Sequence, residues 1–230
     1  MSDKEYNKVY TVDYLGNVVE GNPIRYLNVD SEKMKEAAVK SLLADEPVWF
    51  GCDVSKHFHR ELGVMDMDLF DYDSFYNLEF GMDKAARLEY GDSQMTHAML
   101  FTGVDLDSHN KPVKWRVENS WGTKGGEKGY NIMSDKWFDE YNYEVVVHKN
   151  HLPDELVDLF NNEDAIHLDP WDPCRPSAAA GSPWILNVSS TLTPKPQFIH
   201  RLQYLLRLLG SGTLLSHGPC PDIQNPSSIP

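Results

Sequence analysis

The chain has 230 residues, of which 41% are hydrophobic, enough for the packed core of one large or two small domains. Its 35 acidic residues outnumber 21 basic ones, and the net charge of −14 excludes a nucleic-acid binder, because affinity for phosphates needs clustered Lys and Arg. Three widely spaced cysteines form neither a disulfide framework nor a CxxC metal pattern, so we expect a reducing, cytoplasmic compartment. The N-terminus has no apolar signal-peptide core and no apolar run reaches about 18 residues, so no membrane segment is predicted.

Sequence patterns over residues 1–173 predict an α+β domain whose sheet is mostly antiparallel, with helices at its edges. Residues 47–54 are apolar on both faces, as in a buried strand, and Asp30 or Ser31 can cap the helix before it. The predicted elements are a strand at 24–30, a helix at 32–46, a strand at 47–54, a packed excursion at 55–92, strands at 95–104, 113–119, 129–133 and 143–149, and short helices at 134–140 and 153–160.

Residues 174–230 form a second region of different composition. They hold eight prolines and eight serines, with four basic residues and one acid, and most of them show no sustained periodicity. One segment, 197–210, places leucines on a helical stripe and stops at Gly210. We therefore predict that 174–230 is a largely disordered tail.

Three residues at two strand ends predict a catalytic site. His97 enters an apolar strand, and Asn119 stands where a later strand runs into a glycine-rich turn. A neutral imidazole acts as a base only when its other nitrogen is held by a partner, and an amide oxygen can do this without adding charge. Trp121 can cover that hydrogen bond and keep water from competing for it.

Other motifs favour plain structural interpretations. Residues 122–129 resemble a phosphate loop superficially, yet no Gly-Lys-Ser/Thr follows, so a turn is predicted. His57 and His59 lack a third ligand at a recognisable spacing, so we predict no metal site there. The acidic run 66–73 lacks the glycine and terminal glutamate of an EF-hand loop and is predicted to be solvated.

The order His…Asn-Ser-Trp-Gly resembles the C-terminal half of papain-like cysteine peptidases. Over residues 6–173 the blocks VWFGCDVSKHF, MTHAM, KWRVENSWG, KGY and YEVVV resemble those of bleomycin hydrolases. The resemblance implies the β-barrel lobe of a two-lobed enzyme with flanking helices. It also implies that His97 is the general base and acid and that Asn119 orients it, with Trp121 in support.

The nucleophilic cysteine of that family is not matched in this chain. Cys52 lies inside an apolar strand pattern, where a thiol is usually inert. The resemblance implies a cysteine aminopeptidase that cuts amide bonds near a free amino terminus and detoxifies bleomycin, whereas this chain is predicted to be inactive alone. The alternative is a non-catalytic product that keeps oligomer or binding contacts.

The resemblance also implies the partners. They are a peptide or aminoacyl-amide substrate and, for the full-length family, a homohexamer; no cofactor or metal is expected. Family chains end shortly after a match to Trp171-Asp172-Pro173, and their terminal arm lies in the active-site cleft. This chain departs from that pattern at Cys174, so its tail is predicted not to take the place of the arm.

Overall fold

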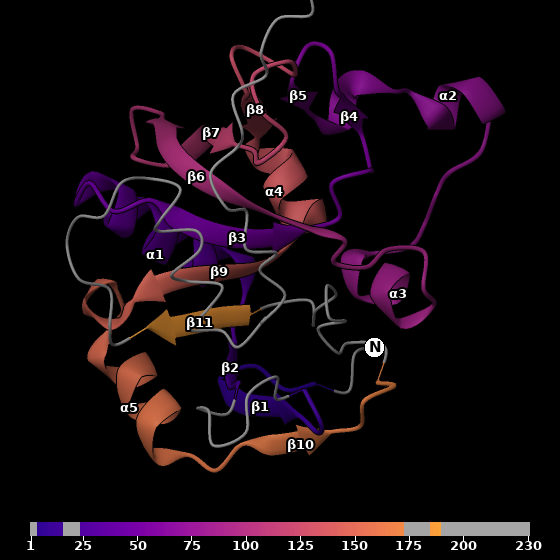
Figure 1. Ribbon diagram of the computed structural model, residues 1–230. Coiled ribbons are helices and arrows are strands. Elements are labelled where there is room, and N and C mark those ends of the chain that lie inside the picture. Colours follow the sequence, from indigo (N-terminus) through magenta and orange to yellow (C-terminus); the bar gives the residue numbers. More distant parts are fainter. Residues whose placement is uncertain (1–3, 16–23, 173–184, 190–230) are drawn as a thin grey trace, which may run out of the picture.

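The computed structural model describes residues 4–15, 24–172 and 185–189 and confirms the α+β class (Figure 1). Its strands form one sheet in the order β10-β1-β2-β11-β9-β3-β6-β7-β8-β5-β4. The strands are β1 (Lys8–Val12), β2 (Tyr26–Asn28), β3 (Val48–Cys52), β4 (Phe58–His59), β5 (Val64–Met65), β6 (His97–Leu106), β7 (Pro112–Glu118), β8 (Tyr130–Ser134), β9 (Asn142–His148), β10 (Ile166–Leu168) and β11 (Ile185–Ser189).

The sheet is mostly antiparallel, as predicted; the parallel pairs are β1 with β10, β5 with β8 and β9 with β11. No ladder within the described residues joins β10 to β4, so the predicted barrel is not closed by hydrogen bonds between strands. These two strands are the two ends of the sheet order, and Figure 1 shows β10 at the bottom of the molecule and β4 at the top.

Helices lie beside the sheet. They are α1 (Ser31–Leu43), α2 (Tyr72–Tyr76), α3 (Lys84–Glu89), α4 (Asp135–Tyr141) and α5 (Asp154–Asn162), with 3-10 turns η1 (Met67–Leu69) and η2 (Lys149–His151). The Asp30 side chain caps α1 by accepting a hydrogen bond from the Lys33 N–H at 2.8 Å. Of the two cap residues that the sequence left open, the structure selects Asp30.

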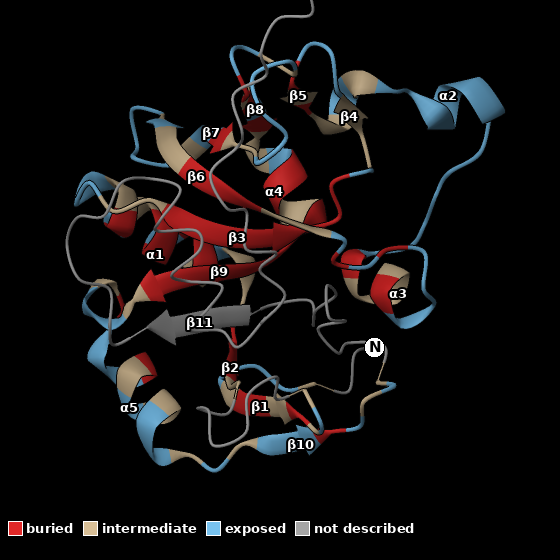
Figure 2. Ribbon diagram, viewed as in Figure 1, coloured by how far each residue is buried: buried red, intermediate tan, exposed pale blue. Residues whose placement is uncertain are grey.

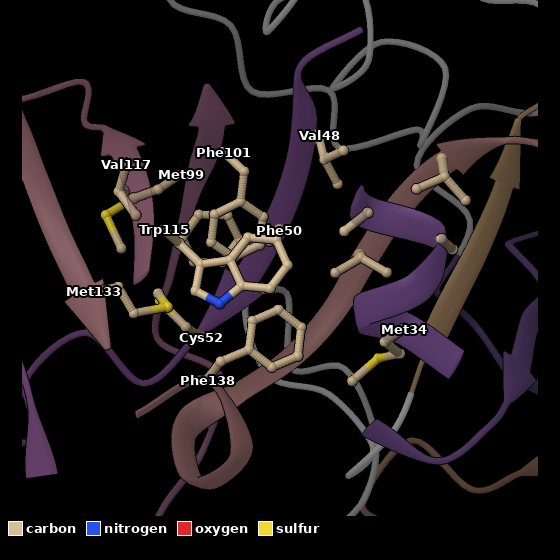
Figure 3. Packing of buried hydrophobic residues seen from close by; sticks show 14 of the residues in the cluster. Met34, Val48, Phe50, Cys52, Met99, Phe101, Trp115, Val117, Met133 and Phe138 are labelled. Atoms are coloured by element: carbon tan, nitrogen blue, oxygen red, sulfur yellow. The ribbon is translucent and has the colours of Figure 1, made fainter. Parts of the chain in front are cut away.

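The core lies where β3, β6 and β7 pack against α4 (Figure 3). The rings of Phe50 and Phe101 stack with centroids 3.8 Å apart, and the Trp115 and Phe138 rings stack at 5.0 Å. The central strands are buried and the loops at their ends are exposed (Figure 2). This aromatic core fixes the β6–β7 pair, whose end carries the predicted site.

The predicted excursion at 55–92 contains β4, β5, η1, α2 and α3. Its middle part projects from the sheet, with α2 at the upper right of Figure 1, and is not packed as predicted. The exposed apolar side chains of this part are Phe70, Tyr72, Phe75, Tyr76, Leu78, Phe80 and Met82, which we call the 70–82 segment.

The strands β1 and β10 were not predicted. They lie near the two ends of the family-like region and pair with each other, with Tyr10 opposite Ile166. In the tail, the structure describes β11, which the sequence analysis also missed. The predicted helical stripe at 197–210 and the rest of the tail lie outside the described residues. Among the residues described, no helix has the length and hydropathy needed to cross a membrane.

A buried lysine makes stability depend on pH. Burial lowers the pKa of Lys84 from its ordinary 10.5 to about 7, and its Nζ donates to the Asn142 carbonyl oxygen at 2.6 Å. Between these two pKa values the unfolded chain binds a proton that the folded chain lacks, so the free energy of unfolding rises with pH.

We therefore expect the free energy of unfolding of the native chain to increase relative to that of the Lys84→Met variant when the pH is raised from 7 to 9. Urea unfolding at both pH values measures it. If this difference stays constant or falls as the pH rises, the lowered pKa of Lys84 in the folded chain is contradicted.

Candidate active site

The two residues predicted to share a site meet at one edge of the sheet. His97 is the first residue of β6, and Asn119 directly follows β7, the strand paired with β6. In the antiparallel ladder Leu100 lies opposite Glu118, so the start of β6 and the end of β7 come together. The His97 Nε2 and Asn119 Oδ1 atoms are 3.0 Å apart, within hydrogen-bond distance.

The amide orientation of Asn119 defines the tautomer of the imidazole. Asn119 Oδ1 also accepts a hydrogen bond from the Ser120 backbone N–H at 2.7 Å, so the oxygen is the atom that faces the ring. An oxygen can only accept, and therefore Nε2 carries the proton and donates it. His97 Nδ1 then has a free lone pair, and no described residue forms a hydrogen bond with it.

Trp121 lies against the imidazole. Its ring centroid is 4.8 Å from that of His97, with a tilt of 34° between the planes. The indole is 48% exposed, and the Arg60 guanidinium lies 5.0 Å from the centre of the ring. Phe58 is a further neighbour of Trp121, with 6.4 Å between the two ring centroids. One face of the site is thus built from the β7–β8 loop and the β4 region.

The glycine-rich loop 122–129 positions Asn119. The Asn119 N–H donates to the Gly129 carbonyl at 3.3 Å, and β8 follows the loop directly, as expected for a turn. Gly129 has φ +89°, and an added Cβ would lie 2.6 Å from the Gly122 carbonyl oxygen. Gly126 has φ +57°, and its Cβ would lie 2.1 Å from the Tyr130 carbonyl oxygen. Both backbone conformations favour glycine.

We expect Gly126→Ala to lower the free energy of unfolding by more than about 1 kcal/mol, because it combines a left-handed φ with a backbone clash. Chemical denaturation measures the change. Gly91→Ala is the matched control: Gly91 has φ +74° but its Cβ would meet nothing within 4 Å. If both variants lose the same free energy of unfolding, the close contact with the Tyr130 carbonyl oxygen does not contribute to the destabilisation.

Cys52 lies opposite His97 in the β3–β6 ladder, yet its thiol belongs to the core. The residue has no exposed surface, and Figure 3 places it among Trp115, Met133 and Phe138. Burial, with a contribution from the Asp53 carboxylate, raises the pKa of this thiol well above its usual value. Burial therefore favours the neutral thiol, and the inert role of Cys52 stays a prediction.

A buried polar network beside the site was not found by sequence analysis. Asp53 Oδ2 accepts from the Ser93 hydroxyl at 2.9 Å, and Asp53 Oδ1 accepts from Thr96 Oγ1 at 3.2 Å. The Ser93 and Tyr143 hydroxyl oxygens are 2.6 Å apart. Because Thr96 immediately precedes His97, the network anchors the start of β6. Its only signal in the sequence is an aspartate at the end of a fully apolar strand pattern.

The two remaining histidines of the sequence analysis do not join the site. His57 has φ +46°, so the chain there is not extended, and its ring stacks on Tyr141 at 5.9 Å between centroids. His59 Nδ1 accepts from the Leu62 N–H at 3.3 Å. Among the described residues, no group of three or more His, Cys, Asp or Glu side chains could hold a metal ion.

Comparison with known proteins gives the family. Residues 1–175 match the Peptidase C1-like family. The chain belongs to this family. Aminopeptidase C of Lactococcus lactis subsp. lactis is 48% identical over 172 residues, which are 75% of this chain and 39% of the relative. Bleomycin hydrolase of Rattus norvegicus is also 48% identical over 172 residues, 74% of this chain and 38% of the relative.

A solved structure agrees with this placement. The crystal structure of PepW from Lactobacillus rhamnosis HN001 superimposes with a TM-score of 0.73 at 51% identity, covering 75% of this chain and 39% of that one. The predicted resemblance to bleomycin hydrolases is therefore confirmed at the level of the Peptidase C1-like family. The chain spans about two fifths of the length of these relatives.

Proposed function

We propose that this chain supplies the acid–base half of a cysteine aminopeptidase active site. The observation that carries the proposal is the 3.0 Å contact between His97 Nε2 and Asn119 Oδ1. It fixes the ring and leaves Nδ1 as the basic nitrogen, which is the arrangement that an activated thiol nucleophile requires. Trp121, packed on the ring, shields this hydrogen bond on one side.

The steps follow from the position of the proton. A cysteine thiol transfers its proton to His97 Nδ1, and the resulting thiolate adds to the carbonyl carbon of the substrate amide. When the tetrahedral intermediate collapses, the C–N bond breaks and Nδ1–H gives its proton to the leaving amine. Water then attacks the thioester, with His97 taking its proton, and the acid is released together with the regenerated thiol. Throughout, Asn119 Oδ1 accepts from Nε2–H.

The attacking thiolate in this proposal is not Cys52. Its side chain is fully buried in the apolar core, and the raised thiol pKa opposes thiolate formation. The nucleophile is supplied by a part of the enzyme that corresponds to the relatives' remaining length. By itself, this chain is then inactive.

The substrate class is proposed from the relatives. Aminopeptidase C and bleomycin hydrolase are the names of proteins about half identical to this chain over 172 residues. Accordingly, we propose peptides and aminoacyl amides with a free amino terminus as substrates, with the amide of bleomycin as a further one. A reducing compartment such as the cytoplasm suits a thiol enzyme of this kind.

A chimera tests the proposed function. Residues 4–172 of this chain replace the corresponding region of Lactococcus lactis aminopeptidase C, and hydrolysis of an aminoacyl fluorophore is measured with and without a thiol-alkylating reagent. We expect thiol-dependent turnover. A chimera that folds, as judged by circular dichroism, and yet stays at background would contradict the proposal.

The 70–82 segment favours a second function, a non-catalytic chain that keeps assembly contacts. In this segment Phe75, Leu78 and Phe80 are 78%, 60% and 63% exposed, and clustered apolar surface of this kind usually marks a contact with another protein. Sedimentation of the chain, beside a Phe75→Ser/Phe80→Ser variant, tests it. Self-association that the double variant abolishes, with no turnover in the chimera, would favour this second function, which includes the hexamer expected from the family.

A further inference from the structure

Two strands of the family-matching region are separated by a strand from outside it. Both β2 and β9 lie within residues 1–175, which match the family, whereas β11 lies in the tail. Within the described residues no ladder joins β2 directly to β9; β11 is paired with both (Figure 1). It is antiparallel to β2 and parallel to β9, with five residue pairs along β9.

The backbone of β2 and β9 requires a partner at this position. All three residues of β2 are buried, as are six of the seven residues of β9. Buried N–H and C=O groups without hydrogen-bond partners are strongly unfavourable, and in the structure β11 is the strand that pairs with both of these edges. The two facing edges therefore form a slot that is complementary to one extended segment.

The slot also divides the sheet. Without β11, the ladder order separates into a unit of β10, β1 and β2 and a second unit running from β9 to β4. The first unit would then be held to the second by two chain connections, from β2 to α1 and from β9 through η2 and α5 to β10, and by side-chain packing, but not by strand hydrogen bonds. Filling the slot is what makes the described strands one sheet.

We propose that the edges of β2 and β9 form a strand-acceptor site and that residues 185–189 of this chain occupy it by β-strand addition. The segment ILNVS suits this role, because it contains two β-branched residues and no proline, while Pro183 precedes it and Pro194 follows it. Main-chain hydrogen bonds to both neighbours supply the affinity. The tail thus carries a docking strand, a role independent of the proposed catalytic function.

Hydrogen exchange tests the assignment in the intact chain. Asn187, opposite Val146 in the β9 ladder, is replaced by proline, which removes a backbone donor from a strand paired on both sides. We expect amide protection at Leu27 and Val145 to fall by about 10-fold or more, while protection at Phe101 and Val117 in β6 and β7 is kept. Asn187→Val, which retains the donor, is the matched control and should leave all four amides protected.

Unchanged protection at Leu27 and Val145 in the Asn187→Pro variant would overturn the proposal. A second measurement decides the case in which this variant does not fold. A specific protease site is inserted between residues 173 and 184 of the native chain, the folded protein is cleaved, and the fragments are separated by size under native conditions. Co-elution of the fragment that contains 185–189 with the lobe supports the docking strand, and its separation from the lobe overturns it.

Discussion

Replacing His97 with alanine in the chimera with aminopeptidase C is expected to lower kcat/KM about 10⁴-fold or more. The imidazole takes part in every proton transfer of the proposed reaction, both in forming the thiolate and in protonating the leaving amine. With His97 removed, the thiol keeps its proton and the amine must leave as an unprotonated anion. Initial rates on an aminoacyl fluorophore measure the effect.

Asn119→Ala is the matched comparison, with a smaller loss expected. Asn119 touches the ring only at Nε2, 3.0 Å away, and acts by fixing its direction and tautomer. Misdirecting a catalytic group costs roughly 10²-fold, so a measurable rate should remain. If Asn119→Ala were the more damaging in kcat while circular dichroism showed intact folding, the two roles would have to be reassigned.

The isolated chain is expected to show no thiol-dependent aminopeptidase turnover at a protein concentration where the chimera is readily measured. Cys52 is the cysteine nearest His97 along the described ladders, and it has no exposed surface and a raised thiol pKa. Loss of the attacking group removes several orders of magnitude in rate. Alkylation at pH 8 should likewise leave Cys52 unmodified in the folded chain and modify it in urea, as peptide mass spectrometry can establish.

The Cys52→Ala variant provides the control for this result. Its turnover should equal that of the native chain, both at background, and its free energy of unfolding should fall because a buried side chain is shortened. Turnover by the native chain that vanishes in Cys52→Ala would show that this thiol is the nucleophile after all.

The local elements of the fold could be predicted where the sequence carries a clear period. The helix expected at 32–46 is α1 at Ser31–Leu43, and the buried strand expected at 47–54 is β3. In contrast, β1, β10 and β11 were missed, because each is short and is stabilised by partners far away along the chain. For such strands the pairing, and not the local pattern, determines the conformation.

The candidate site likewise has a part that the sequence predicts and a part that it does not. His97 and Asn119 were chosen because an imidazole base needs an orienting partner, and the structure brings them together. The network of Asp53, Ser93 and Tyr143 has no comparable spacing in the sequence, because its members come from three separate segments of the chain and meet only through packing. Similarly, the left-handed backbone of His57 could not be predicted, because even a residue type enriched at positive φ adopts it at few of its positions.

The place of β11 in the sheet bears on how the protein is made. Its neighbours β2 and β9 emerge earlier from the ribosome, and β2 emerges long before residues 185–189 exist. During synthesis the slot edges are unpaired, and such edges recruit other strands, including those of nascent neighbours. The late, non-local pairing also slows the final step of folding. Expression yield should therefore depend on chaperones that shield this edge until translation reaches the tail.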